Sequence, residues 1–169
     1  WTQMSELSQC IKHARLSADS TDKIENPRTY CQKDSDCTVQ LCNGAANREW
    51  VKTAPPEPPC ARYEGYGAEC IERACTAIKS LTVEADDNRF YPGTPIRVVK
   101  GSAVKIILNV RFVDVYYGGL DFRSPKFTTP AIVPGGSITV EFTADESFTI
   151  TSYWSASGVK KSDIAIIVE

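Results

Sequence analysis

The second half of the chain alternates apolar and polar residues with the period of two that a half-buried β-strand requires. The alternation is clearest at residues 138–142 (Ile-Thr-Val-Glu-Phe) and 148–150 (Phe-Thr-Ile). Turn residues separate such runs, as at Pro92-Gly93 and at residues 134–136 (Pro-Gly-Gly). The predicted strands are Leu81–Ala85, Ile96–Val99, Ala103–Phe112, a piece near Val115–Phe122, Ser137–Thr143, Phe148–Tyr153 and Ile164–Val168. Short strands at this spacing predict a mainly β, antiparallel sandwich or barrel.

The N-terminal residues have helical rather than strand periodicity. From Met4 to Ala14 apolar side chains recur at helical spacing, and Ser5 can serve as the N-cap, so residues 4–16 predict a short amphipathic helix. Cys10 lies at the edge of the apolar stripe. The helix either packs on the rest of the protein, with Cys10 fixing it there, or reaches another subunit.

Residues 19–80 are rich in turn-forming and cysteine residues. Asp, Asn, Gly and Pro recur too often for long regular elements, and the Ala-Pro-Pro-Glu-Pro-Pro run at residues 54–59 predicts an extended loop. The sequence therefore predicts two parts: a partly helical, cysteine-rich module at residues 1–80 and a β-sandwich at residues 81–169.

Length, charge and hydropathy argue against some classes of function. A chain of 169 residues that is 42% hydrophobic and 24% charged can bury a core. Its formal charge of −2 offers no basic face for nucleic acid, and it contains no apolar run of about 18 residues that could span a membrane. The chain begins at Trp1 rather than at a methionine, from which we expect that a signal peptide has been removed.

The cysteines point to an oxidising compartment, and hence to secretion. Their spacing lacks the CxxC pairs typical of zinc sites, so we expect disulfides. Six cysteines in one module allow 15 pairings, and the sequence does not choose among them. The seventh is left over, either as a buried free thiol or as a link to another molecule, and Cys10 is the best candidate for such a link. The disulfide candidates are Cys10, Cys31, Cys37, Cys42, Cys60, Cys70 and Cys75.

The second half also resembles a known family. The segments that carry the resemblance are residues 90–92 (Phe-Tyr-Pro), 96–101 (Ile-Arg-Val-Val-Lys-Gly), 104–110, 114–117 (Asp-Val-Tyr-Tyr), 133–136 (Val-Pro-Gly-Gly), 140–145 and 166–169. In this order they resemble cupredoxin domains, above all the soluble domain of cytochrome c oxidase subunit II. The resemblance implies a Greek-key cupredoxin-like sandwich. The cysteine-rich segment is similar to small disulfide modules of secreted bacterial and archaeal proteins.

The copper ligands of that family are absent. The resemblance places its first His, and the Cys, Cys, His and Met of its last loop, at Tyr117, Thr151, Ser155, Val159 and Ser162. Residues 76–169 contain no Cys, His or Met, so no thiolate or imidazole is available for copper there. We therefore expect no cofactor and no metal in the sandwich.

Four aromatic residues lie in the two loops that would have met at the metal: Tyr116, Tyr117, Tyr153 and Trp154. They either fill the vacated site as a hydrophobic plug or form a recognition surface at the loop end. No catalytic motif occurs, and His13 is the only histidine, so the sequence indicates no enzyme.

These observations favour a secreted, non-enzymatic structural or interaction protein. We expect protein partners, self-assembly included, in a cell-surface or extracellular assembly such as a filament. One alternative is a redox or copper-handling protein that takes ligands from the N-terminal part, such as Met4, His13 and a free cysteine. Another is a soluble module in which the four aromatic residues bind a peptide or a glycan.

Overall fold

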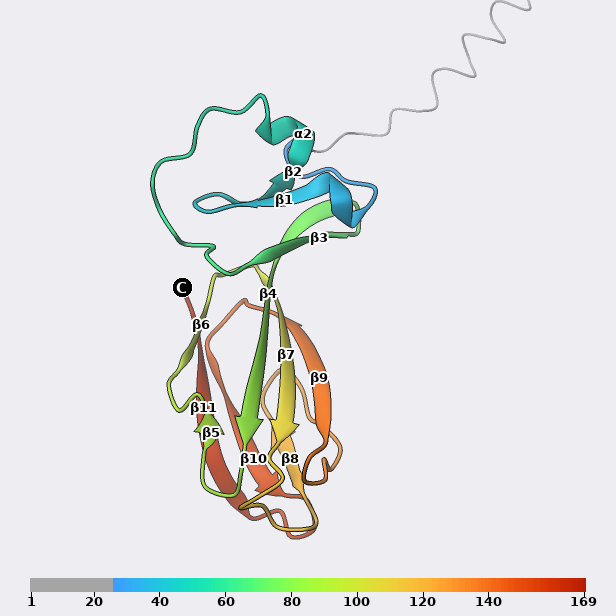
Figure 1. The fold of residues 1–169 in the computed structure, drawn as a ribbon, viewed down its shortest axis with the longest axis vertical. Coiled ribbons are helices and arrows are strands. Elements are labelled where there is room, and N and C mark those ends of the chain that lie inside the picture. Colours follow the sequence, from blue (N-terminus) through green and yellow to red (C-terminus); the bar gives the residue numbers. More distant parts are fainter. Residues whose placement is uncertain (1–25) are drawn as a thin grey trace, which may run out of the picture.

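The computed structural model describes residues 26–169, so the predicted helix at residues 4–16, with Met4, Cys10 and His13, lies outside the described part. Two β-sheets face each other, and a small cysteine-rich module lies at one end of them (Figure 1). One sheet has the strand order β6-β11-β10-β8, and the other has the order β3-β4-β7-β9 with β5 paired to β4. The sandwich strands are β4 (Ala74–Ala85), β5 (Phe90–Tyr91), β6 (Ile96–Val98), β7 (Ala103–Val110), β8 (Leu120–Arg123), β9 (Ser137–Thr143), β10 (Phe148–Trp154) and β11 (Lys160–Val168).

The alternation read from the sequence forms the core. In β7, Val104, Ile106 and Leu108 are buried, while the residues between them face outward. From the opposite sheet, Ile150 and Ile166 meet them with no exposed surface. Burying one such side chain stabilises the fold by roughly 1.5–3 kcal/mol, which explains why the period-two pattern identifies these strands.

Two strand pairings within the mainly antiparallel sandwich are parallel. β4 pairs with β7 in parallel, and so does β6 with β11, whereas the other pairings are antiparallel. The reason is topological. After β4 the chain crosses to the other sheet for β6 and returns to the first for β7, so β7 runs in the same direction as β4.

The predicted boundaries also shift. The piece expected near Val115–Phe122 begins as a strand only at Leu120, because the preceding residues turn: the Gly119 amide donates to the Tyr116 carbonyl at 2.8 Å. Asp114 and Gly119 adopt positive φ angles in this turn. The first and last sandwich strands start earlier than predicted, at Ala74 and Lys160.

The module contains a short hairpin and two short helical turns. Its elements are the 3-10 turn η1 (Asp34–Asp36), β1 (Cys37–Gln40), β2 (Gly44–Asn47), α2 (Arg48–Val51) and β3 (Gly67–Ile71). Asn47 caps α2, since its Oδ1 accepts hydrogen bonds from the amides of Glu49 and Trp50 at 2.9 and 3.1 Å. The side chain thus satisfies amides that the short helix leaves unpaired.

Three disulfides hold the module together, as the cysteine content predicts. They are Cys31–Cys70, Cys37–Cys75 and Cys42–Cys60. The first two fasten the start of the module to the β3–β4 hairpin, and the third closes the proline-rich loop. All six cysteines from 31 to 75 are thus paired with one another, and the cysteine left over in the sequence is Cys10.

β4 connects the module to the sandwich without a break. It crosses the predicted boundary between residues 80 and 81, pairing first with β3 and then, from Ile78 to Ala85, with β7. The Val99 amide donates to the Tyr66 hydroxyl at 2.7 Å, which adds a contact between the two parts. The module therefore extends one sheet of the sandwich.

Candidate functional site at the loop end of the sandwich

Three loops meet at the end of the sandwich that faces away from the module (Figure 1). We call residues 112–119, 130–136 and 155–159 the tip. Leu120 and Ile132 exchange backbone hydrogen bonds of 3.0 and 2.8 Å, and the Ser155 amide donates to the Gly119 carbonyl at 3.3 Å. The backbone itself therefore joins the loops into one surface.

Three of the four aromatic residues singled out in the sequence gather at this end. The Tyr116 ring lies 4.2 Å from the Tyr117 ring and 5.4 Å from the Trp154 ring, measured between centroids. The hydrogen bond between the two tyrosines raises the pKa of Tyr116 above its ordinary value. Its phenol is therefore neutral at physiological pH, so it packs and forms hydrogen bonds and does not act as a base.

Tyr153 does not join this cluster. It faces the outer side of β10, where the Arg123 guanidinium lies 4.3 Å from its ring centroid. Arg123 in turn pairs with Asp121 at 2.7 Å. The aromatic surface at the loop end thus consists of Tyr116, Tyr117 and Trp154, and Tyr153 belongs to a neighbouring face of the sheet.

Hydroxyl groups occupy the strand positions that the cupredoxin resemblance assigns to ligands. The Ser162 amide donates to Ser152 Oγ at 3.1 Å, and the two serine hydroxyls lie 2.9 Å apart. On the outer face, Thr151 Oγ1 donates to Asp163 Oδ1 at 2.6 Å. The strand pairing shifts register between Thr151 and Tyr153, so this polar patch coincides with a β-bulge.

The polar groups on the outer face are engaged with one another around Asp163. Burial opposes the ionisation of Asp163, but hydrogen bonds from Lys160 and Thr151 outweigh it and lower the pKa of that carboxyl. Lys160 Nζ lies 2.6 Å from Asp163. The arrangement fixes two strands to each other, and the Asp163 carboxylate has both oxygens engaged.

The five assigned positions do not converge on one point. Tyr117 is 81% exposed and Val159 is also exposed, so both side chains face solvent. Thr151 faces the outer side of β10, whereas Ser162 contacts the inward Ser152. Ser155 is turned inward, and its Oγ is buried without a hydrogen-bond partner among the described residues.

Sequence reasoning missed Ser152 and the contact that Asp87 makes with the tip. Ser152 is fully buried and continues the inward series of Phe148 and Ile150, so the period of two could have identified it. Asp87 Oδ2 accepts a hydrogen bond from the Tyr116 amide at 3.1 Å, a contact between distant segments that no local pattern predicts.

Asp86, the residue before Asp87, fixes the turn at residues 86–89 that supports the tip. It is 2% exposed and accepts hydrogen bonds from the Tyr91 hydroxyl at 2.7 Å and from the amides of Asn88 and Arg89 at 2.8 and 2.9 Å. Arg111 lies 3.6 Å away as its counter-ion. Burial disfavours the charge, but these hydrogen bonds and Arg111 outweigh it and hold the pKa of Asp86 below its ordinary value.

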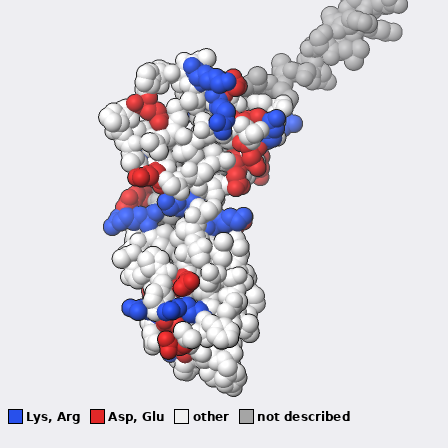
Figure 2. All heavy atoms as spheres, in the orientation of Figure 1, with Lys and Arg blue, Asp and Glu red and all other residues white. Residues whose placement is uncertain are grey.

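The outer side of the tip is apolar. Five large hydrophobic side chains are exposed there: Phe112, Val113, Tyr117, Val133 and Val159. The three loops carry a single charged residue, Asp114. On the face shown in Figure 2, the lowest edge of the molecule is white, and a cluster of blue and red side chains lies above it.

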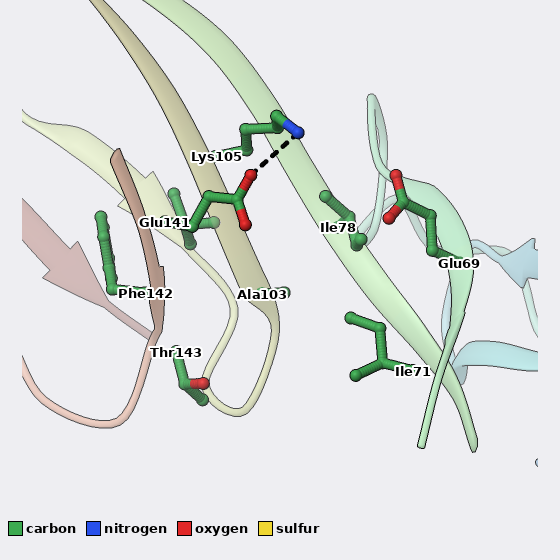
Figure 3. Close-up of a pocket in the computed structure, with 9 residues that line it drawn as sticks. Glu69, Ile71, Ile78, Ala103, Lys105, Glu141, Phe142 and Thr143 are labelled. Carbon is green, nitrogen blue, oxygen red and sulfur yellow. Dashed lines mark ion pairs between the residues drawn. The ribbon is translucent and has the colours of Figure 1, made fainter. Parts of the chain in front are cut away.

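A hollow of about 300 Å³ lies on the outer face of the five-stranded sheet near the module (Figure 3). Lys105 and Glu141 form a 2.9 Å ion pair across its floor, between β7 and β9. The hydrogen bond to Glu141 raises the pKa of Lys105, so the amine stays protonated and cannot act as a nucleophile. Ile71 and Ile78 form the opposite wall.

Among residues 26–169, one cluster of potential metal ligands is present, formed by Cys31, Cys37 and Cys75. All three sulfur atoms are engaged in disulfides, so none is a thiolate. The described part of the chain also has no helix long and apolar enough to cross a membrane.

The strand order and the crossing connections define a cupredoxin-like β-sandwich with a disulfide-rich N-terminal region. No protein-family model matches the chain, and no curated protein matches it either.

Solved structures of copper proteins are similar in part. A multicopper oxidase aligns with 63% of this chain and 47% of its own, at 16% identity and a TM-score of 0.48. A copper nitrite reductase from Nitrosomonas europaea aligns with 54% of this chain and 41% of its own, at 20% identity and a TM-score of 0.44. A Cu-containing nitrite reductase from Thermus scotoductus SA-01 aligns with 55% and 28%, at 19% identity and a TM-score of 0.40. This chain therefore spans less than half the length of each.

Proposed function

We propose that this protein is a secreted, non-enzymatic interaction subunit of an extracellular or cell-surface assembly, built on a cupredoxin-like scaffold without copper. One observation carries the proposal: the loop end presents Phe112, Val113, Tyr117, Val133 and Val159 to solvent on a nearly uncharged surface. Large exposed apolar patches are rare on soluble monomers, and where they occur they commonly mark interaction sites.

The residues around that surface support a binding role over chemistry. The assigned ligand positions carry hydroxyl, phenol and alkyl groups, which cannot replace a thiolate and an imidazole for copper. Two polar pairs beside the tip, Ser152–Ser162 and Thr151–Asp163, engage each other, whereas Ser155 Oγ has no partner among the described residues. A nucleophile activated by an adjacent histidine is not available in the sandwich, since His13 is the only histidine of the chain.

Three disulfides support the extracellular setting. The two longest close loops of 39 and 38 residues, and such cross-links persist where the medium is oxidising. In a reducing compartment the module, whose buried cluster consists of Cys31, Cys37 and Cys75, would lose the cross-links that hold it together.

Assembly and copper uptake together test the proposal. We expect purified protein with three intact disulfides to associate with increasing concentration in sedimentation velocity, and electron microscopy to show the assembly in its native setting. Copper titration is expected to give no intense visible Cu–thiolate band. A strict monomer at millimolar concentration would remove the assembly role, and an intense blue band would favour the redox alternative.

A further inference from the structure

A second hollow, of about 380 Å³, lies along β11, between residues 161–165 and the segment 88–95 that leads into β6. Phe90 and Ile164, both buried in the core, contribute to its lining. The remaining lining residues are largely polar or cationic. No lining residue belongs to the tip, so a ligand here would be additional to the partner proposed above.

The hollow exists because β6 covers only part of β11. β6 pairs with β11 from Ile166 to Val168 and lies beside that end of the strand (Figure 1). β5 pairs with β4 in the opposite sheet, so the chain crosses between the sheets at residues 92–95 and reaches β11 only at Ile96. On its other side, β11 pairs with β10 over residues 160–166. Within the described part of the chain, residues 161–165 are therefore a sheet edge without a strand partner on the side of the hollow.

The main-chain groups of Asp163 and Ala165 point toward this open edge. The amides of Ser162 and Val168 donate to serine hydroxyls on the β10 side at 3.1 and 2.9 Å. Because successive residues of a strand direct their main-chain groups to opposite sides, Asp163 and Ala165 direct theirs away from β10. Among the described residues, no backbone hydrogen bond joins their amides to residues 88–95. The edge thus offers donors and acceptors in strand geometry.

Two cations line the same hollow without an ion-pair partner among the described residues. Arg89 is exposed, with its guanidinium carbon 4.6 Å from the centre of a tyrosine ring, and Lys161 Nζ lies 4.0 Å from the centre of the Trp154 ring. Such stacking directs a cation without neutralising it. Asp163 is the one acidic lining residue, and its carboxylate is engaged by Lys160 and a threonine hydroxyl. The lining therefore favours an anionic ligand.

We infer that an extended peptide with acidic side chains binds in this hollow as an additional strand beside β11. Its main chain pairs with Asp163 and Ala165, and its carboxylates contact Arg89 and Lys161. The edge at residues 161–165 is about 13 Å long at the usual rise of about 3.3 Å per residue, which suits about five residues of peptide. A small free anion would engage the cations but leave the main-chain groups of the edge unpaired.

Titration with a synthetic peptide tests the inference. The probe is the acetylated and amidated hexapeptide Glu-Val-Glu-Val-Glu-Val, added to isotope-labelled full-length protein with its disulfides intact. Amide chemical shifts in NMR spectra report the contact, and we expect the largest changes at residues 88–95 and 161–165. Added sodium chloride should weaken the binding, because the ion pairs lie at the surface.

Two control peptides separate charge from strand pairing. Lysine in place of each glutamate keeps the alternation and reverses the charge, so we expect no binding. Methylation of every amide nitrogen keeps the carboxylates and removes the N–H donors, so we expect this peptide to bind far more weakly than the probe.

Matched variants test the two cations. Arg89→Gln and Lys161→Gln should each weaken binding of the probe by about fivefold, the upper end for an exposed ion pair. Lys100→Gln is the control, since Lys100 is also exposed but lies outside the hollow, and it should bind the probe as the parent protein does. Circular dichroism establishes that each variant is folded.

The outcomes are independent of the tip. Equal binding of the lysine peptide would overturn the charge argument, and equal binding of the methylated peptide would overturn the added strand and leave an anion site only. Chemical-shift changes confined to residues 112–119, 130–136 and 155–159 would also overturn the inference, because the peptide would then bind the tip. Any of these results leaves the assembly role standing, whereas a strictly monomeric protein that binds the probe at residues 161–165 would remove that role alone.

Discussion

Replacing Asp86 with asparagine tests whether a buried carboxylate holds the tip in place. The turn that Asp86 organises contacts the tip directly: the Asp87 amide donates to the Asp114 carbonyl at 3.0 Å, and Asp87 accepts from the Tyr116 amide. A loosened turn therefore affects both the stability of the fold and the arrangement of the exposed aromatic residues.

The size of the effect follows from the contacts. In Asp86→Asn the remaining carbonyl oxygen can still accept from the amides of Asn88 and Arg89, but the new NH₂ group faces the Tyr91 hydroxyl and the positively charged Arg111. One charge-assisted hydrogen bond is lost and the ion pair disappears. We expect the free energy of unfolding to fall by about 2 kcal/mol at neutral pH.

The loss of stability in Asp86→Asn should become smaller as the pH falls. Because the folded state lowers the pKa of Asp86 below its ordinary value of 3.8, the ionised carboxylate stabilises the fold above pH 4. That contribution is lost as the pH falls through the lower pKa of the folded state. Asparagine does not titrate, so the difference between parent protein and variant should shrink as the pH falls below 4.

Urea unfolding at pH 7, 5 and 3, followed by tryptophan fluorescence, measures the difference. Glu146→Gln is the matched control, since the Glu146 side chain is well exposed and its carboxylate lies 3.3 Å from Lys126. We expect little change in that variant. The reasoning about Asp86 is refuted if its variant loses the same stability at every pH, or if the control is destabilised as much.

Two further predictions concern the frame around the site. Replacing Cys37 and Cys75 together by alanine opens a 38-residue loop and should lower the free energy of unfolding by about 4 kcal/mol. Removing the Cys42–Cys60 disulfide, which closes 18 residues, should lower it by less. Equal losses in urea unfolding would contradict the loop-closure account. In Gly119→Ala, the new Cβ would lie 2.1 Å from the Ile132 carbonyl oxygen at a positive φ, so urea unfolding should show a loss of about 2 kcal/mol or more. Gly158→Ala, also at positive φ but in open space, should cost about 1 kcal/mol, and similar losses in both would refute the packing argument.

The sequence predicted the sandwich because its inner faces obey a period of two. Ile106, Ile150 and Ile166 are each flanked by less buried residues, and the pattern identifies their strands. It could not predict that β4 begins at Ala74, since the first part of that strand is buried by disulfides and β3 rather than by the opposite sheet. The parallel pairings depend on which sheet the chain visits between strands, and no local pattern records that.

The candidate site was predicted in part. The two aromatic loops do meet, as Tyr116 and Trp154 show. Tyr153 departs from the cluster because adjacent residues of a strand face opposite sides. The disulfide pairing depends on contacts between segments far apart in the chain, which the sequence left open.

The loop end presents side chains outward rather than toward a shared ion. A metal ligand has to point inward, toward an ion shared with other loops. Tyr117, at the position that the cupredoxin resemblance assigns to the first histidine, points outward instead and is 81% exposed. Backbone contacts such as Leu120–Ile132 and Ser155–Gly119 join the loops to one another. Because the backbone holds the loops together, their outward side chains can be large and apolar without loosening this end, as the binding role proposed above requires.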